Sequence, residues 1–260
     1  MKKFAFSLFI ILLLSQNVYA EELILISRST SMENVVIDGK WTSKEEWKES
    51  VHKIINFDEN KTVHLRTAHH ENFIYFLLDF VSDTKPDTNM DRAMICLNSD
   101  NDKSLRSDLD DYCFVVILNG KSSHVLVGGS INAINGNFEK IENDFSFIGI
   151  GTTSDITDRY SQIPHSSYEF KIPTDLVGRS STYGFYFSLY DYEQNKLYSW
   201  PASPTKNNFS IPSPNMWGIL VSPDHSIPEF NLPVIMLGIL ITSIILIQFK
   251  IRFSKIPPLS

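Results

Sequence analysis

The chain has little positive charge. Among its 260 residues, 23 are Lys or Arg and 30 are Asp or Glu, so the formal net charge is −7. Proteins that bind nucleic acid gain much of their affinity by neutralising phosphates with basic side chains. An acidic chain without a basic stripe is therefore not expected to bind nucleic acid, and its charge favours cations or neutral molecules as partners.

Recognised catalytic motifs are also missing from the sequence. It contains no Gly-x-Ser-x-Gly, no His-Glu-x-x-His and no local Cys-His signature. The glycines at 128–129, 136 and 149–151 are not followed by a helical pattern, so they indicate turns rather than phosphate-binding loops. Paired carboxylates such as Asp110 and Asp111 can hydrolyse glycosides in other proteins, but no cleft-lining scaffold accompanies them here. We expect no enzyme activity.

The N-terminus has the pattern of a secretory signal peptide. Two lysines precede an apolar run over residues 4–14, and Val18-Tyr19-Ala20 fits small-x-Ala cleavage after Ala20. The apolar run is too short to cross a bilayer of roughly 30 Å. Residues 1–20 are therefore predicted to be a cleaved signal peptide.

The C-terminus has the pattern of a membrane anchor. Residues 232–249 carry no charge, and at about 1.5 Å rise per residue they reach roughly 27 Å, which is enough to span. Lys250, Arg252 and Lys255 follow directly, and basic residues favour the cytoplasmic side. The sequence predicts one transmembrane helix at 231–249 and a cytoplasmic tail at 250–260. The domain between the two ends would then be displayed at the cell surface.

The middle of the chain favours β-structure. It is rich in aromatic residues, which suit half-buried strands, and short strand-like runs alternate with turn residues. Strands are predicted at 62–68, 73–81, 93–97, 112–118, 124–127, 145–149, 168–172 and 184–190. A capping-box pattern predicts one helix at 42–49. Residues 21–201 are expected to form an all-β sandwich, and the proline-rich segment 202–230 is expected to be a stalk.

Several separated motifs carry a family resemblance. They are 36–41 (VIDGKW), 46–47 (EW), 67–68 (TA), 73–76 (FIYF), 168–173 (YEFKIP) and 199–201 (SWP). In this order they resemble the family-9 carbohydrate-binding modules and their DOMON-like relatives, which include the haem-binding subunit of ethylbenzene-type dehydrogenases. The resemblance implies an antiparallel, jelly-roll-like β-sandwich without catalysis. Its members bind sugars at an aromatic clamp, carry haem, or have no known ligand.

A second resemblance lies beside the predicted anchor. Pro228-Glu229-Phe230 directly precedes the apolar span and is similar to the PEF-type C-terminal sorting signals of archaeal surface proteins. That resemblance implies cleavage by a membrane-embedded transpeptidase and transfer to a different anchor.

Saccharide or glycan binding is the predicted function. Trp41 and Trp200 stand beside polar or proline residues and are the candidate sugar platforms, whereas Trp47 is expected to plug the core. The alternatives are a structural or protein-interaction domain of the cell envelope without sugar binding, and a haem-binding electron-transfer subunit. Haem binding is disfavoured. Met90 and Met94 are the central candidates for one axial ligand, but no pattern in the sequence indicates a second axial ligand.

The acidic stretch after residue 97 is a candidate Ca²⁺ site. Hard cations take six to eight oxygen ligands, and Asn98, Asp100 and Asp102, continued by Asp108 and Asp110, can supply them from a loop. A solvated acidic hairpin loop explains the same residues equally well. The EF-hand is rejected, because its glycine and its terminal glutamate are missing.

The two cysteines lie symmetrically about this acidic loop. A hairpin that pairs Leu97 with Tyr112 would also place Cys96 opposite Cys113, and opposed Cβ atoms in strands lie within disulfide reach. We expect a Cys96–Cys113 disulfide, which would persist outside the cell. Buried free thiols are the alternative.

Overall fold

The computed structural model describes residues 23–57, 60–120, 123–129, 138–142, 146–202 and 210–226. The predicted signal peptide (1–20), the tripeptide at 228–230, the span at 231–249 and the tail at 250–260 all lie outside these ranges. Within the described ranges, no helix is long and apolar enough to cross a membrane. The chain divides into two units at residue 222, and the described part of the second is the short helix α3 (Pro223–Ser226).

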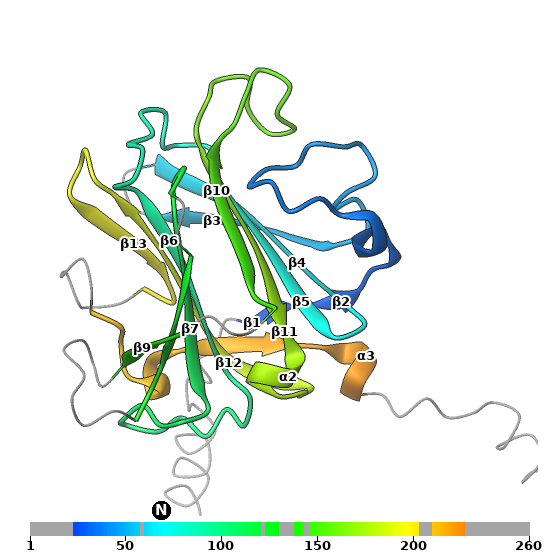
Figure 1. Ribbon diagram of the computed structural model, residues 1–260, viewed down its shortest axis with the longest axis vertical. Helices are drawn as coiled ribbons and strands as arrows, with labels where there is room; N and C mark the ends of the chain where they lie inside the picture. The colour runs from blue at the N-terminus through cyan, green and yellow to red at the C-terminus, as the bar shows by residue number, and fades with distance from the viewer. Residues whose placement is uncertain are drawn as a thin grey trace, which may run out of the picture. The chain divides into compact units, whose positions relative to one another are not determined.

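Two β-sheets face each other in the first unit (Figure 1). Sheet A runs in the order β1 (Leu23–Leu25), β14 (Gly218–Val221), β12 (Thr182–Asp191), β6 (Arg92–Asn98), β7 (Asp111–Ile117), β8 (His124–Val127) and β9 (Glu139–Ile141), and β13 (Lys196–Trp200) also pairs with β12. Sheet B runs β10 (Ile148–Thr153), β11 (Ser166–Pro173), β5 (Phe73–Phe80), β4 (Lys61–His70) and β2 (Ser27–Arg28), and β3 (Val51–Phe57) also pairs with β4. Short helices lie at η1 (Thr30–Asn34), α2 (Thr174–Val177) and η3 (Pro214–Met216).

The expected all-β sandwich is confirmed, with one difference in strand direction. The pairs β1–β14 and β2–β4 are parallel, and the other pairs between the named strands are antiparallel. Both sheets are therefore mixed. In each parallel pair, a short strand near the N-terminus lies beside a strand that does not follow it directly in the chain. Parallel strands need such a long connection, because a tight hairpin turn joins only antiparallel strands.

The main core lies between the two sheets and follows the alternation of side chains along the strands. On β5, Ile74, Phe76, Leu78 and Phe80 belong to this core, while Tyr75 and Leu77 point to the opposite face. Both faces of β5 are buried, as expected for a central strand.

A second layer covers the outer face of sheet B. It consists of Met32, Trp41 and Trp47 packed on Ala68, Tyr75 and Leu77. The segment that carries the tryptophans is built from turns, so the helix predicted at 42–49 is wrong. Its capping box does form: the Ser43 N–H donates to Glu46 Oε2 at 3.1 Å, and the Glu46 N–H donates to Ser43 Oγ at 3.3 Å. No helix follows this capping box, because Trp47 has a left-handed φ of 52°.

The sandwich also extends beyond the predicted boundary at residue 201. Gly218–Val221 forms β14 between β1 and β12, and the side chain of Trp217 is 2% exposed. The expected stalk over 202–230 is therefore wrong for its described residues up to Ser222. The prolines on either side of Gly218–Val221 argue against a strand in the sequence. The strand forms because it pairs with β1 and β12, which are distant in the chain.

Candidate functional site

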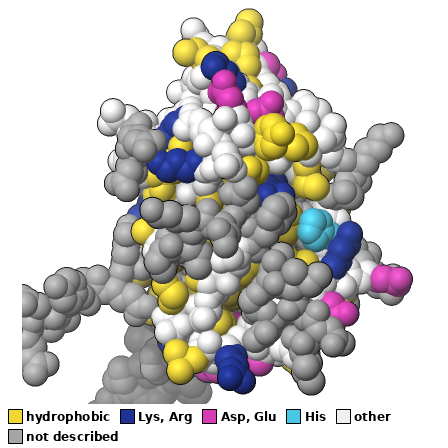
Figure 2. Space-filling view, turned by 90° about the vertical axis from the view of Figure 1, so that its left-hand side faces the viewer, with side chains coloured by type: hydrophobic (Ala, Val, Ile, Leu, Met, Phe, Trp, Pro, Cys, Tyr) yellow, Lys and Arg dark blue, Asp and Glu magenta, His cyan; other side chains and the backbone are white. Residues whose placement is uncertain are grey.

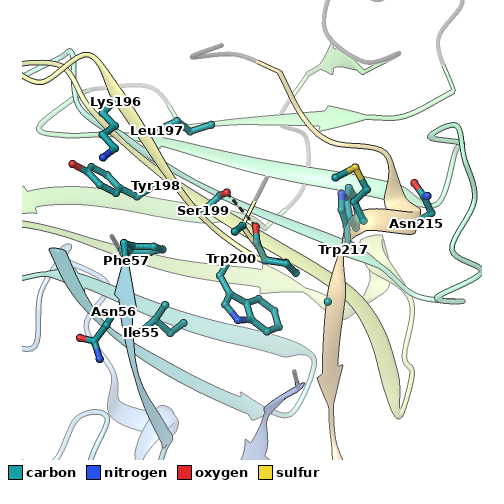
Figure 3. A pocket seen from close by; sticks show the side chains of 14 residues that line it. Ile55, Asn56, Phe57, Lys196, Leu197, Tyr198, Ser199, Trp200, Asn215 and Trp217 are labelled. Atoms are coloured by element: carbon teal, nitrogen blue, oxygen red, sulfur yellow. Dashed lines mark hydrogen bonds between the residues drawn. The ribbon is translucent and has the colours of Figure 1, made fainter. Parts of the chain in front are cut away.

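A pocket of about 600 Å³ opens where β3 of sheet B approaches β13 of sheet A (Figure 3). Its lining combines aromatic side chains with amide, hydroxyl and ammonium groups. The aromatic members are Phe57, Tyr198, Trp200 and Trp217, and the polar members include Asn56, Lys196, Ser199 and Asn215. Figure 3 shows Ile55 and Phe57 reaching the pocket from β3, with the Asn56 side chain on the other side of that strand, and Trp217 and Asn215 at the opposite end. Asn56 and Asn215 are exposed, and Phe57 is half-buried.

Trp200 forms a wall of this pocket rather than an open platform. Its side chain is 5% exposed, and its ring lies 5.7 Å from the ring of Phe185 between centroids. The ring also packs on the backbone of Gly218, where an added Cβ would come within 2.4 Å of it, so the close contact requires glycine. The Lys53 ammonium lies 5.5 Å from the ring centroid. A ligand can therefore reach only part of this ring.

Trp41 lies in the layer outside sheet B and is 8% exposed. The guanidinium groups of Arg66 and Arg159 lie over its ring, at 4.6 and 4.3 Å from the centroid. It lines a separate hollow of about 590 Å³ together with Thr42, Lys48 and other residues. The structure does not bring Trp41 and Trp200 together, so the two predicted platforms do not form one clamp.

Figure 2 views the molecule from the side of β13, the left-hand side of Figure 1. On the described surface of this face, Lys and Arg side chains are interspersed with Asp, Glu and apolar ones. The described part of this face shows no continuous basic stripe of the kind that a phosphate backbone needs.

The predicted Ca²⁺ ligands are Asn98, the last residue of β6, and four aspartates of the loop between β6 and β7, and many of their oxygens accept hydrogen bonds from N–H groups of that loop. Asn98 Oδ1 accepts from the Asn101 N–H, Asp100 Oδ1 from the Asp102 N–H at 3.2 Å, and Asp108 Oδ1 from the Asp110 N–H at 3.3 Å. Burial, with Asp108 and Asp100 nearby, raises the pKa of Asp110 to about 8. The negative charges of these carboxylates therefore repel one another. Ca²⁺ binding at this loop stays a prediction.

The predicted disulfide is confirmed. Cys96 and Cys113 are joined, and β6 and β7 pair in the expected register, with Leu97 opposite Tyr112. The disulfide is buried beside Trp217 and Tyr186, with Met94 packed against the same cluster. Met94 thus fills space in an apolar region, as a Met in a core strand does.

One carboxylate ties three of the resemblance motifs together. Glu169 of β11 accepts hydrogen bonds from Trp47 Nε1 at 2.7 Å and from the N–H groups of Asp38 and Gly39, each at 2.8 Å. Gly39 has φ of 96°, a backbone conformation that favours glycine in the Asp38-Gly39 turn. Burial raises the pKa of Glu169 to about 8, outweighing the three hydrogen bonds, which lower it. These contacts are structural, as expected for Trp47.

A buried polar cluster on the same outer face was not predicted. Asp79, Asp158 and His165 each place one potential ligand atom within 4.8 Å of the others. His165 Nε2 contacts Asp79 Oδ1 and lies 3.8 Å from Asp158 Oδ1. Burial raises the pKa of Asp79 to about 6, although its hydrogen bond with His165 lowers it. The one sequence feature that could have indicated this cluster is Asp79, an acidic residue inside the otherwise apolar run Phe73–Phe80.

Comparison with known proteins supports the fold assignment. No family model matches the chain, and no curated protein does. A solved carbohydrate binding module family 9 (CBM9) from Caldicellulosiruptor kristjanssonii in complex with cellotriose is similar, with 15% identity, a TM-score of 0.51, and coverage of 77% of this chain and 93% of that one. The chain has the β-sandwich fold of that module. A CBM9 from the same organism in complex with glucose matches at 14% identity and a TM-score of 0.45, over 77% of this chain and 95% of that one.

Proposed function

We propose that this chain is a non-catalytic carbohydrate-binding domain that takes a neutral saccharide into the pocket beside Trp200. The observation that carries the proposal is the lining of this pocket, which combines aromatic rings with amide, hydroxyl and ammonium groups. A pyranose presents apolar C–H faces to aromatic rings and hydroxyls to amides and hydroxyls, and ligand sites combine these two kinds of group. The CBM9-like fold supports the same reading.

The pocket is suited to binding rather than hydrolysis. Glycoside hydrolysis generally needs two carboxyl groups beside the scissile bond, one of them as general acid. The described residues that line this pocket include no Asp or Glu. A sugar held there would meet no general acid from these residues.

The domain is further proposed to act outside the cell, anchored through residues 231–249. The Cys96–Cys113 disulfide supports this placement, because disulfides persist in oxidising compartments. Cell fractionation of the full chain tests it, since recovery with the cytosol would contradict both export and anchoring. The intact mass of the membrane-bound chain shows whether cleavage at Pro228-Glu229-Phe230 occurs.

Saccharide binding is tested by a glycan array, followed by calorimetric titration of the full chain with cellotriose and with any array hit. The variant Asn215→Ala removes an exposed amide of the lining and leaves the core intact. Loss of one hydrogen bond at about 1 kcal/mol should weaken binding about fivefold. Phe57→Ala removes the most accessible aromatic ring of the pocket and should weaken it as well.

Asn34→Ala is the matched control, because Asn34 is exposed and lies outside the lining of this pocket. It should bind as the unaltered chain does. If no saccharide on the array binds, or if Asn215→Ala keeps full affinity, the proposal is wrong. An envelope interaction domain would then be the better interpretation.

A further inference from the structure

The cluster of Asp79, Asp158 and His165 lies outside both sugar-platform candidates and the acidic loop. Asp79 comes from β5, Asp158 from the loop after β10, and His165 from the position just before β11. The side chains of Asp79 and His165 are 0% exposed, and that of Asp158 is 2% exposed. In the described part of the chain, this is the one group of His, Cys, Asp and Glu side chains with the spacing of a metal centre.

The orientation of His165 leaves its second nitrogen facing two carboxylates. Nδ1 lies 2.7 Å from the carbonyl oxygen of Ile163 and 2.9 Å from the hydroxyl of Ser154; because the carbonyl can only accept, Nδ1 carries the proton and donates to it. In the neutral ring, Nε2 then carries a lone pair and points at Asp79 Oδ1, with Asp158 Oδ1 also near. With the ring neutral, three acceptors converge away from water, and either a proton on Nε2 or a metal ion would offset their repulsion.

Charge balance favours a divalent ion over a single proton. A proton on Nε2 would leave one positive charge against two buried carboxylates. A divalent ion beside a neutral imidazole would leave the cluster neutral. A buried atom also lacks a partner: Asp79 Oδ2 makes no hydrogen bond with any described residue. Buried carboxylate oxygens are normally satisfied, so this one needs an explanation such as an ion.

The surroundings hold the ligand atoms in place. Asp158 Oδ1 accepts hydrogen bonds from the N–H groups of Tyr160 at 2.8 Å and Ser161 at 3.0 Å. The Nδ1 hydrogen bond fixes the ring of His165, as outer partners of metal-bound histidines do. Asp158 also lines a small cavity of about 40 Å³ with Trp41, which exceeds the space that a water molecule needs.

We propose that Asp79, Asp158 and His165 form a structural zinc site. An imidazole nitrogen with two carboxylates suits Zn²⁺, whereas Ca²⁺ and Mg²⁺ take oxygen ligands. Three protein ligands leave a fourth position for water or for Asp79 Oδ2. The ion ties the loop between β10 and β11 to β5. It thereby holds Tyr160, whose ring stacks on His64 at 3.8 Å between centroids.

The test loads the full chain with equimolar ZnCl₂, removes loose metal by dialysis, and measures bound zinc by mass spectrometry and affinity by competition with a chromophoric chelator. Asp158→Asn removes a charge while keeping an oxygen that can accept from Tyr160 and Ser161. Asp100→Asn is the matched control in the acidic loop. The unaltered chain and Asp100→Asn should retain one zinc per chain, and Asp158→Asn should bind it more than about tenfold more weakly.

Two further readouts separate a zinc site from a buried ion pair. Co²⁺ in place of Zn²⁺ should give the visible absorption of a four-coordinate ion in the unaltered chain and lose it in Asp158→Asn. Excess Ca²⁺ should not displace the zinc. An unaltered chain that retains no zinc would overturn the proposal, whether or not the variant folds. So would equal zinc affinity in Asp158→Asn, or ready displacement by Ca²⁺.

Discussion

The substitution Glu169→Gln tests whether one carboxyl group holds the outer layer to sheet B. Oε2 accepts two backbone N–H groups and Oε1 accepts the indole N–H of Trp47. Gln keeps one oxygen, which can serve the two backbone donors, but its NH₂ group then faces the indole N–H. This conflict arises whether or not Glu169 is protonated, because a carboxyl O–H can accept a hydrogen bond and an amide NH₂ cannot.

The expected cost follows from leaving one buried donor without an acceptor. Such a donor costs about 1 to 3 kcal/mol, and Trp47 is 0% exposed, so water cannot replace the acceptor without repacking. For a domain of this size, that corresponds to a fall in Tm of roughly 2 to 12 °C. Urea unfolding followed by far-ultraviolet circular dichroism measures it without relying on tryptophan fluorescence.

A double-mutant cycle isolates the interaction. Trp47→Phe removes the indole donor, so Glu169→Gln in that background should cost little, and the coupling free energy should be about 1 to 3 kcal/mol. If Glu169→Gln costs the same with and without the indole, the hydrogen bond does not hold this layer, and the reasoning fails.

Three other predictions follow from the same structure. Replacing Cys96 and Cys113 together by Ala should lower the free energy of unfolding by about 3 kcal/mol in the loop-entropy model, measured by urea unfolding, and alkylation of the unaltered chain without reductant should leave its mass unchanged. Because burial raises the pKa of Glu169 from 4.5 to about 8, the folded chain keeps a proton that the unfolded chain loses. Its contribution to stability should therefore fall as pH rises from about 4.5 to 8, and the pH profile of unfolding should be flatter in Glu169→Gln. If the acidic loop binds Ca²⁺, thermal unfolding should shift upward in millimolar Ca²⁺ relative to chelator and shift less in Asp110→Asn; identical curves for the unaltered chain would rule the site out.

Local pattern was enough to find much of the sandwich. Apolar runs rich in aromatic residues, such as Phe73–Phe80, were predicted as strands within a residue or two of their bounds. Hairpin symmetry about the acidic loop gave the register that pairs Cys96 with Cys113. Both the strand bounds and the hairpin register depend on residues close in sequence. The alternation of side chains and the length of the loop determine them.

Features that depend on distant contacts escaped prediction. The capping box at Ser43 and Glu46 favours a helix locally. The indole of Trp47 instead donates a hydrogen bond to Glu169 of β11, which is 122 residues away in the chain, and no helix forms. Trp200 stands beside a proline in sequence, which made it look exposed, yet β12 and β14 bury it. Asp79 and His165 lie 86 residues apart, so no motif spacing could join them.

The pairing of β1 with β14 sets an order on folding. Leu23, near the start of the chain, lies opposite Ile219, so the first strand of sheet A has no partner until almost the whole domain has been made. A chain that grows from its N-terminus must hold Leu23–Leu25 as an unpaired edge meanwhile, and such edges invite pairing with other molecules. A fragment cut after Pro201 would remain permanently in that state, with the flank of β12 at Thr182–Phe185 open as well.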